Sequence, residues 1–370
     1  MSLLVVVAAC ANAEPSSPDG APPIVPDGRL ADRCDPGELA IGIAPSGQVT
    51  CLSIDAAAGK AVDDNCSVYL GWRDGCDGCT TDPAKWGFAG GDRCTSGLGA
   101  GNTCTTQMLG GQPVRLFGID FDGDVDDNDK LYTSLHCTQP AASTGATAPC
   151  PPGEFVTGTN GASLRCAPLA AAVATYVREQ CSLYVGWQDG CNGCVTEPVK
   201  WGQSGDSSCA NGAGVDNSCT MPMLADQTAV LFGLNPDGDV DGNDKLHVGV
   251  RCGAAAPATS TTTTLCPPGQ FVVGTSMDGS LFCESAAPAI TNYFADHCSL
   301  YFGWRDNCGG CTTPPTKWGT AKVGACANGA GADNTCTTFT LGGQTVALFG
   351  ISPDGDVDGN DALYVGLQCR

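Results

Sequence analysis

The chain has 370 residues, a formal net charge of -22 at pH 7 and 25 cysteines. So acidic a protein is repelled by nucleic acid and by anionic membrane surfaces, and we expect neither as a partner. Cysteines at this density are typical of exported proteins, in which disulfides persist. No stretch of the sequence approaches the roughly 18 consecutive apolar residues that indicate a membrane-spanning helix.

A short apolar run at the N-terminus ends at Cys10. Residues 7–10, Val-Ala-Ala-Cys, resemble the lipobox of bacterial lipoprotein signal peptides. The resemblance implies that residues 1–9 are removed as a signal peptide, that Cys10 carries the lipid, and that Ala11 directs the protein to the outer membrane or cell surface. The lipid would be its only contact with a membrane. Because no Lys or Arg precedes the run, a truncated ordinary secretory signal with an unmodified Cys10 is the alternative.

The segment 10–33 is acidic and rich in proline, which predicts a flexible tether. Beyond it the cysteines fall into three sets of eight, an even and repeated pattern that indicates a disulfide framework. Each set ends in a repeat of constant length, namely 66–137, 181–252 and 298–369. We therefore expect three extracellular modules, at 34–137, 150–252 and 266–370. Flexible linkers rich in Ala, Thr, Ser and Pro would join them, at 138–149 and 253–265.

Each module is expected to begin with a small β-hairpin closed by two cysteines. These hairpins are predicted at 34–51, 150–166 and 266–283. An Ala-rich stretch follows, and residues 167–180 have the apolar spacing of a helix, which Gly59 weakens in the equivalent 52–65. The helix would be a structural spacer.

Inside the repeats, short β-branched and aromatic runs alternate with Gly-rich loops and predict antiparallel strands. Examples are 183–187, 229–234 and 246–251. The fold class is therefore mainly β, with three tandem disulfide-rich modules, each a hairpin and short helix before a loop-rich antiparallel core. Four disulfides per module, each worth about 2–4 kcal/mol, would compensate for a small core.

One acidic motif occurs once in each repeat. Its residues are Asp122, Asp124, Asp126, Asn128 and Asp129; Asp237, Asp239, Asp241, Asn243 and Asp244; and Asp354, Asp356, Asp358, Asn360 and Asp361. The alternating aspartates resemble the start of EF-hand loops and the short calcium loops of dockerins and thrombospondin type 3 repeats. Calcium prefers several oxygen ligands, which alternate residues of a tight loop can supply, so we expect three Ca²⁺ sites.

The motif departs from an EF-hand at position 12, where Thr133, Val248 and Val365 replace the bidentate Glu. Either the last Asp of each motif closes the site, or an acid from another loop does so. The acids of the Trp-x-Asp segments are the candidates for the second case, namely Asp74, Asp189 and Asp306. The alternative to calcium is an exposed acidic hairpin without an ion.

A Cys-x-x-Cys pair also recurs, at Cys76 and Cys79, Cys191 and Cys194, and Cys308 and Cys311. Such pairs can form a Cys₄ zinc site or a redox centre. The exported context and the even cysteine count favour structural disulfides. The pairing cannot be derived from spacing, but the first and last cysteines of each repeat lie on predicted strands. We therefore expect Cys181 to pair with Cys252.

All six tryptophans lie in two repeated contexts. Trp72, Trp187 and Trp304 follow a glycine, and Trp86, Trp201 and Trp318 lie in Lys-Trp-Gly. Exposed rings of the first set beside Asp and Asn could stack on sugar rings. The alternative is that they fill the core.

Catalysis has little support, because the three histidines, His136, His247 and His297, occupy different places in the repeats. The sequence therefore predicts a non-enzymatic, calcium-binding surface lipoprotein that acts as an adhesion or binding protein, with a glycan or a protein as its ligand. A structural spacer of the envelope or extracellular matrix is the first alternative. An exported hydrolase that uses acid pairs is the second.

Overall fold

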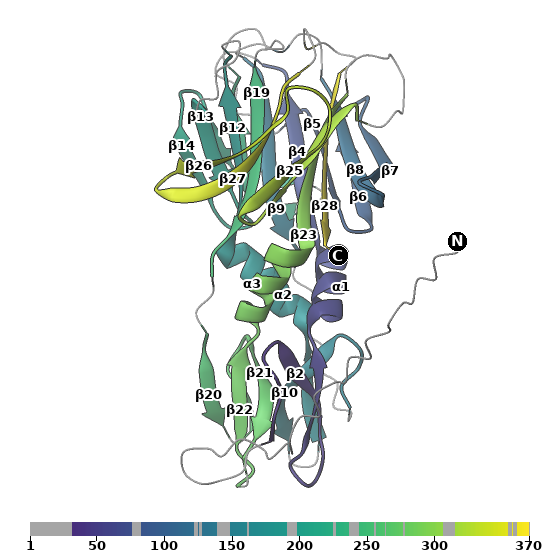
Figure 1. The fold of residues 1–370 in the computed structure, drawn as a ribbon, viewed down its shortest axis with the longest axis vertical. Helices are drawn as coiled ribbons and strands as arrows, with labels where there is room; N and C mark the ends of the chain where they lie inside the picture. The colour runs from purple at the N-terminus through teal and green to yellow at the C-terminus, as the bar shows by residue number, and fades with distance from the viewer. Residues whose placement is uncertain are drawn as a thin grey trace, which may run out of the picture.

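The structure is a computed structural model. It describes residues 32–75, 83–121, 125, 128–138, 149–160, 163–190, 198–224, 227–236, 244–254, 257–262, 264–276, 278–305, 315–353, 357 and 361–369. The described chain is elongated and has three layers along its length (Figure 1). Three β-hairpins form a base, three helices form a waist, and antiparallel sheets form a head.

The base hairpins surround the long axis of the molecule. They are β2 (Glu38–Ile43) with β3 (Val49–Ser53), β10 (Glu154–Asn160) with β11 (Ser163–Pro168), and β21 (Gln270–Thr275) with β22 (Leu281–Ser285). The amide of the cysteine before each hairpin donates a hydrogen bond to the next hairpin. The bonds run from Cys34 to the Val273 carbonyl at 2.6 Å, from Cys150 to Ile41 at 2.8 Å, and from Cys266 to Thr157 at 2.7 Å. Together they close a ring.

Two segments predicted to be tether or linker add strands to the base. β1 (Asp32–Arg33) pairs with β21, and β20 (Thr259–Thr262) pairs with β22. Leu265 forms an isolated bridge with Gly158 of the second hairpin. The ends of the tether and of the second linker are therefore ordered by backbone pairing, which their polar composition does not reveal. Residues 10–31 and 139–148 lie outside the described part of the chain.

The helices of the waist are α1 (Asp55–Asn65), α2 (Leu169–Gln180) and α3 (Ala287–His297). Their apolar stripes, which include Val62, Val177 and Phe294, are buried between them. Gly59 does not interrupt α1, because the absence of a side chain there lets the Tyr293 hydroxyl of α3 approach the helix backbone. Each helix leads directly into the first strand of a repeat.

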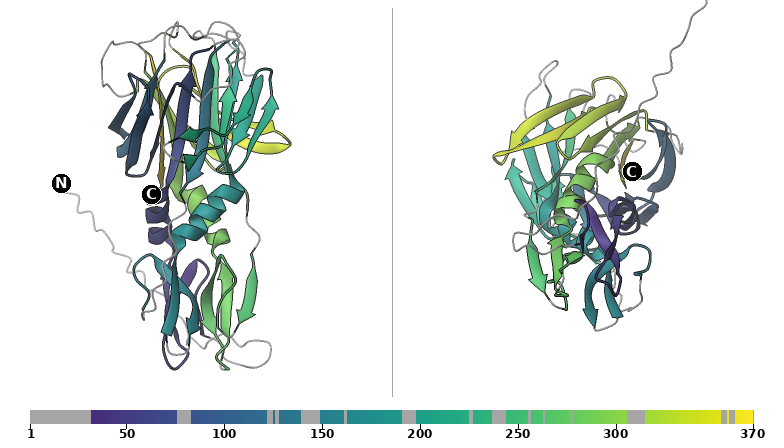
Figure 2. Two further views of the ribbon diagram at one scale, coloured as in Figure 1. Left: turned by 180° about the vertical axis from the view of Figure 1, so that it is seen from behind. Right: turned by 60° about the horizontal axis from the view of Figure 1, so that its bottom comes forward.

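The head consists of three six-stranded antiparallel sheets around the axis (Figure 2). The first, in spatial order, is β15 (Ser218–Thr220), β18 (Leu231–Leu234), β9 (Lys130–Cys137), β4 (Cys66–Arg73), β5 (Lys85–Gly90) and β6 (Arg93–Leu98). The second is β14 (Cys209–Ala213), β13 (Lys200–Ser204), β12 (Cys181–Gln188), β19 (Lys245–Cys252), β27 (Gln344–Ile351) and β26 (Thr335–Leu341). The third is β25 (Ala325–Ala330), β24 (Lys317–Lys322), β23 (Cys298–Arg305), β28 (Ala362–Cys369), β8 (Gln112–Asp120) and β7 (Thr103–Leu109). A short pair, β16 (Met223–Leu224) and β17 (Gln227–Thr228), extends one hairpin.

Each sheet combines strands from two repeats. The second repeat donates β15 and β18 to the sheet of the first, the third donates β26 and β27 to the second, and the first donates β7 and β8 to the third. This exchange is cyclic, so every repeat both gives a hairpin and receives one. The repeats are therefore interleaved in one body rather than strung as separate units.

Apolar side chains from all three sheets meet on the axis. The equivalent residues Phe117, Phe232 and Phe349 are each 0% exposed. One continuous core runs from the base hairpins through the helices into the head. The expectation of small separate cores is thus replaced by a shared one, because the exchanged hairpins bring the inner faces of neighbouring repeats together.

Nine disulfides join the described cysteines, in three equivalent sets. One set closes the base hairpins, Cys34–Cys51, Cys150–Cys166 and Cys266–Cys283, as predicted. A second joins the first and last strands of each repeat, Cys66–Cys137, Cys181–Cys252 and Cys298–Cys369, and confirms the pairing predicted for Cys181. The third, which we call the inter-sheet disulfides, is Cys94–Cys104, Cys209–Cys219 and Cys326–Cys336. Each of these links an edge strand of one sheet to the donated hairpin in the next.

Candidate functional site

The end of the head opposite the base carries the described residues of the predicted calcium motifs. These are Asn128, Asp129, Asp244 and Asp361, and the three aspartates are 1%, 2% and 1% exposed. The other predicted ligands lie outside the described residues, namely Asp122, Asp124, Asp126, Asp237, Asp239, Asp241, Asn243, Asp354, Asp356, Asp358 and Asn360.

The buried aspartates connect each motif to the Trp-x-Asp segment of the same repeat. The amide of Gly75 donates a hydrogen bond to Asp129 Oδ1 at 2.9 Å, and Gly190 donates to Asp244 Oδ1 at the same distance. The segments that sequence analysis named as a second source of ligands therefore lie beside the ends of the motifs. Asp74 and Asp189 are exposed there, and Asp306 lies outside the described residues.

Cationic side chains lie inside the head next to the start of the motifs. Lys85, Lys200 and Lys317 are 5%, 3% and 4% exposed. Lys85 donates to the Asp120 carbonyl at 2.9 Å, and the equivalent Lys317 donates to the Ser352 carbonyl at 3.1 Å. Both carbonyls stand two residues before the first Asp of a motif. These lysines place positive charge close to the aspartates of the motifs and offset part of their negative charge.

Trp72, Trp187 and Trp304, the candidates for ligand stacking, face the axis and are 1%, 4% and 4% exposed. They line an apolar cavity of about 40 Å³ together with equivalent leucines, Leu131, Leu246 and Leu363. Phe121 packs between two of the rings, with its centroid 4.6 Å from that of Trp72 and 5.5 Å from that of Trp304. The rings have no exposed face for a sugar in this arrangement, and they fill the core.

The second tryptophan set lies on the outer face of the sheets. Each ring lies beside a tyrosine ring of the neighbouring strand and nearly parallel to it, with centroids 6.3 Å apart for Tyr69 and Trp86, 6.2 Å for Tyr184 and Trp201, and 6.3 Å for Tyr301 and Trp318. Trp86 is buried, whereas Trp201 and Trp318 are half-buried. These three residues are equivalent in sequence but not in exposure.

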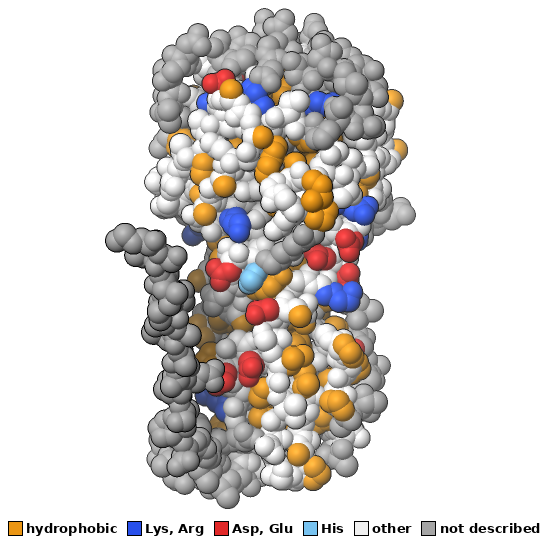
Figure 3. All heavy atoms as spheres, turned by 45° about the vertical axis from the view of Figure 1, so that its right-hand side comes forward, with side chains coloured by type: hydrophobic (Ala, Val, Ile, Leu, Met, Phe, Trp, Pro, Cys, Tyr) orange, Lys and Arg blue, Asp and Glu red, His pale blue; other side chains and the backbone are white. Residues whose placement is uncertain are grey.

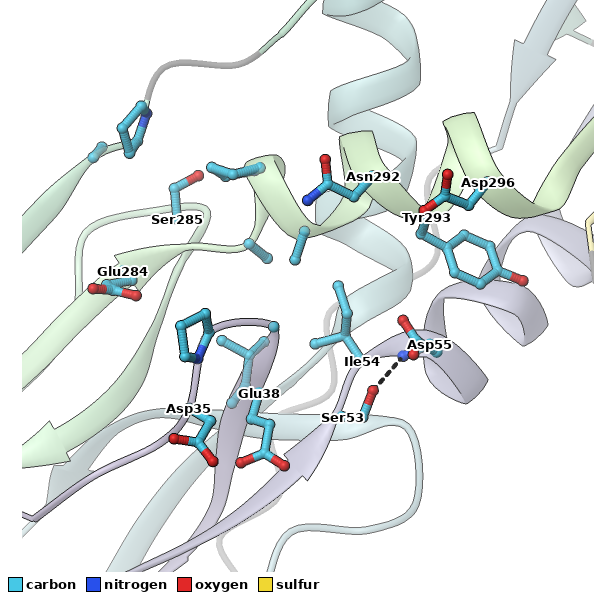
Figure 4. Close-up of a pocket in the computed structure, with 18 of the residues that line it drawn as sticks. Asp35, Glu38, Ser53, Ile54, Asp55, Glu284, Ser285, Asn292, Tyr293 and Asp296 are labelled. Carbon is cyan, nitrogen blue, oxygen red and sulfur yellow. Dashed lines mark hydrogen bonds between the residues drawn. The ribbon is translucent and has the colours of Figure 1, made fainter. Parts of the chain in front are cut away.

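A cleft that sequence analysis did not predict lies at the waist, with a volume of about 630 Å³. Five acidic residues line it, Asp35, Glu38, Asp55, Glu284 and Asp296. Acidic side chains also gather on the surface of this narrow part of the molecule (Figure 3). Figure 4 shows Asp35 and Glu38 on the first hairpin, opposite the α3 residues Tyr293 and Asp296. Because the cleft is assembled from segments far apart in sequence, no local motif could have revealed it.

One ion pair neutralises part of the charge at the waist. Arg33 forms an ion pair with Glu284 at one side of the cleft. Burial, and then the negative charges of Asp63 and Asp55, raise the pKa of Tyr293 to about 12. This tyrosine therefore stays neutral at physiological pH, and its hydroxyl lies against α1 at Gly59.

Several predicted features are not tested by these residues. Within the described ranges, no group of three or more His, Cys, Asp or Glu side chains is arranged to hold a metal ion. Cys10 and the Cys-x-x-Cys pairs, Cys76 and Cys79, Cys191 and Cys194, and Cys308 and Cys311, lie outside them. Among the helices that the structure describes, none is long and apolar enough to cross a membrane.

Comparisons with known proteins do not place the chain in a family. No protein-family model matches it, and neither a curated protein nor a solved structure is significantly similar to it.

Proposed function

We propose that the protein is a non-enzymatic, calcium-binding lipoprotein that is displayed on the bacterial surface and acts as an adhesion or binding protein. The observation that carries this proposal is the separation of its two ends. The N-terminal strand β1 lies in the base, and the acidic motifs follow the strands that end at the opposite end of the head. A lipid at Cys10 would hold the base near the membrane and point the motifs outward.

Rigidity supports the same proposal. Disulfides cross-link the base hairpins, the strands of each repeat and the neighbouring sheets. A cross-linked body keeps its outer end at a fixed height and presents the three repeats in a fixed arrangement. A ligand with repeated epitopes could engage more than one of them, which increases avidity without new contacts.

Calcium is proposed as the ion of the acidic motifs. The full alternation of aspartates recurs in all three repeats, and each motif ends in a buried Asp that is next to the first residue of a strand. Without a cation, the clustered carboxylates would repel one another. The nearby lysines lower the net charge of the site, so we expect an affinity of extracellular grade, roughly 10⁻⁴–10⁻³ M.

Calorimetry on the whole exported chain tests the calcium sites. We expect heat on titration with Ca²⁺ and a fall in melting temperature with chelator. The variant Asp124→Asn/Asp239→Asn/Asp356→Asn should lose both responses, whereas Asp92→Asn, a distant surface change, should keep them. An absence of heat in the unaltered protein, together with a melting temperature indifferent to chelator, would remove calcium from the proposal.

A structural spacer is the second candidate, and the cross-linking of the base and the head favours it. A spacer has no ligand, so the two functions are separated by a glycan array and by adhesion of the labelled protein to cells. Binding above that of a reduced, unfolded control supports the binding function. The third candidate, an acid-pair hydrolase, requires turnover of a polysaccharide that Asp244→Asn or Asp189→Asn abolishes.

A further inference from the structure

We propose that the groove around Trp318 binds a neutral sugar ring. This inference rests on the proposed binding function and gives its ligand a chemical class and a place. The groove has a volume of about 270 Å³ and lies on the outer face of the third sheet, where β23, β24 and β25 meet the tip of the β7–β8 hairpin. Two repeats therefore form it together.

The lining of the groove is unlike the rest of this acidic protein. Among the described residues, no Asp or Glu lines it, although the chain carries a formal charge of -22. Its polar residues are mostly amides and hydroxyls, chiefly Gln112, Asn328, Gln368 and Thr320, and its basic side chains are Lys322 and His297. Neutral hydrogen-bonding groups of this kind match the hydroxyls of a sugar, whereas a cationic ligand would meet Lys322 and no carboxylate of the described lining.

Trp318 supplies a stacking surface whose position is already fixed. One face of its indole lies on the backbone of Gly329, where a Cβ would overlap the ring. Its neighbours Tyr301 and Gly110 hold it from the side, and a methyl group in place of the Gly110 hydrogen would lie 3.6 Å from the ring edge. The C–H groups of a sugar ring pack on the electron-rich face of an aromatic ring, and a pre-positioned ring loses little entropy when it binds.

A buried acceptor in the groove points to a ligand with hydroxyl groups. The Gln368 Nε2 group donates to the Pro113 carbonyl at 3.1 Å, which fixes the orientation of the amide. Its Oε1 atom is buried and has no hydrogen-bond partner among the described residues. A buried acceptor without a donor costs free energy, and because Gln368 lines the groove, a small shift of its amide on binding would expose Oε1 to a sugar hydroxyl and remove that cost.

The two equivalent grooves differ at the same positions. In the second repeat, Arg251 takes the place of Gln368 and donates to Gln344 of the donated hairpin, which bridges the groove. In the first repeat, Phe88 takes the place of Thr320 and packs on Tyr69 with centroids 5.0 Å apart. Trp86 is 4% exposed there. In the Trp318 groove the contact to the donated hairpin is the Gln368–Pro113 hydrogen bond, which occupies Gln368 Nε2 and leaves its Oε1 atom without a partner among the described residues.

The test uses the full exported chain and a panel of soluble cello-, malto-, manno- and galacto-oligosaccharides, followed by tryptophan fluorescence and calorimetry. We expect at least one oligosaccharide to bind. Trp318→Ala should weaken that binding about tenfold or more, because it removes the stacking surface. Trp201→Ala is the matched control, since it removes the equivalent indole from a bridged groove, and it should change the affinity less than about twofold.

Gln368→Leu is a second test that keeps the packing volume. It should weaken binding about fivefold, because the acceptor of a ligand hydroxyl is lost. Equal affinities for the unaltered protein, Trp318→Ala and Gln368→Leu would overturn the site, even if glycan binding and the proposed function stood. Failure of the whole panel to bind would also overturn it. Loss of the calcium response with retained Trp318-dependent binding would instead overturn the calcium part of the proposed function and support the groove.

Discussion

The tryptophans on the inner face of the head sheets are buried to the same extent in all three repeats, whereas those on the outer face are not. On the inner face, Trp72, Trp187 and Trp304 are all at most 4% exposed and meet at one cavity. On the outer face, Trp86 is buried whereas Trp201 and Trp318 are half-buried. The inner tryptophans of the three repeats line one cavity on the axis, so a change in one alters the surroundings of the other two. Each outer tryptophan contacts a single donated hairpin, so a substitution in one groove leaves the other two grooves unaffected.

The difference teaches where to look for function in a repeated chain. Residues that are constant among the three copies form the shared core on the axis and also the Trp–Tyr pairs of the outer face, whereas the outer positions that differ are the ones that give each groove its own lining. The Trp318 groove combines residues that all three repeats share, such as Trp318 and Tyr301, with residues that differ between them, such as Thr320 and Gln368. Substitutions can compare inner positions with outer ones. The largest loss of stability is expected for residues on the axis.

Removal of an inner tryptophan should have the largest effect on stability. Trp187→Ala is expected to lower the free energy of unfolding by about 3–5 kcal/mol, because it enlarges a cavity that already exists on the axis. The outer Trp201→Ala should cost only about 1–2 kcal/mol, since its ring is half-buried. Chemical denaturation of both variants measures the difference, and equal losses would contradict the distinction between the two faces.

The disulfides within a repeat and the inter-sheet disulfides should contribute differently to the free energy of unfolding. Cys181–Cys252 closes a sequence separation of 71 residues, whereas the inter-sheet Cys209–Cys219 closes 10. On chain-entropy grounds, Cys181→Ser/Cys252→Ser should cost about 4 kcal/mol and Cys209→Ser/Cys219→Ser about 3 kcal/mol. Thermal unfolding of both variants measures the two losses. A larger loss for the inter-sheet pair would mean that it stabilises the folded state, by holding the exchanged hairpin, more than it restricts the unfolded chain.

His247 should lower the free energy of unfolding as the pH becomes acidic. Burial, and then the charge of Lys245, lower the pKa of His247 to about 3. The unfolded chain binds a proton near the ordinary pKa of about 6.5, so stability is complete above that pH and is lost as pH falls toward 3. At a pH of about 4 the loss is on the order of 3 kcal/mol.

The control for this effect comes from the other repeats, which have Tyr132 and Tyr364 at the equivalent positions. His247→Tyr should remove the His-dependent part of the acid loss while leaving the carboxylate part. Thermal unfolding of both proteins between neutral pH and the acid range measures the difference. Parallel curves for the two would show that His247 does not titrate on unfolding.

The smallest stability effect is expected from an exchange on the outer face. Arg251→Gln gives the second repeat the residue of the third and removes an exposed hydrogen bond to Gln344. The free energy of unfolding should change by less than about 0.5 kcal/mol. The opened Trp201 groove should then take up a second equivalent of the oligosaccharide that binds Trp318, and calorimetry would show the changed stoichiometry.

Local features were predictable from the sequence, because local physical chemistry determines them. The cysteine-bounded hairpins, the helix over residues 169–180 and the Cys181–Cys252 pair all follow from periodicity, turn residues and strand ends. The mainly β class follows from the same signals. The exact strand bounds are less predictable, since the strand expected over 229–234 begins only at Leu231.

The interleaving of the repeats could not be predicted in the same way. The β8 strand has nearly the same side chains as its copies, so its pattern fits its own sheet and a neighbouring sheet equally well. Only packing in three dimensions determines that β8 joins the neighbouring sheet rather than its own. The waist cleft and the Trp318 groove depend on that choice, because their walls come from different repeats.

The cyclic exchange of hairpins also governs when the chain can fold during its synthesis. The sheet of the first repeat needs β18 from the second, and the third sheet needs β8 from the first. The repeat that emerges first must therefore wait for the repeats behind it before its sheet is whole, and contacts between distant residues form slowly. The second and third sheets are complete only after the strands of the third repeat have been synthesised, so most of the head forms at the end of synthesis.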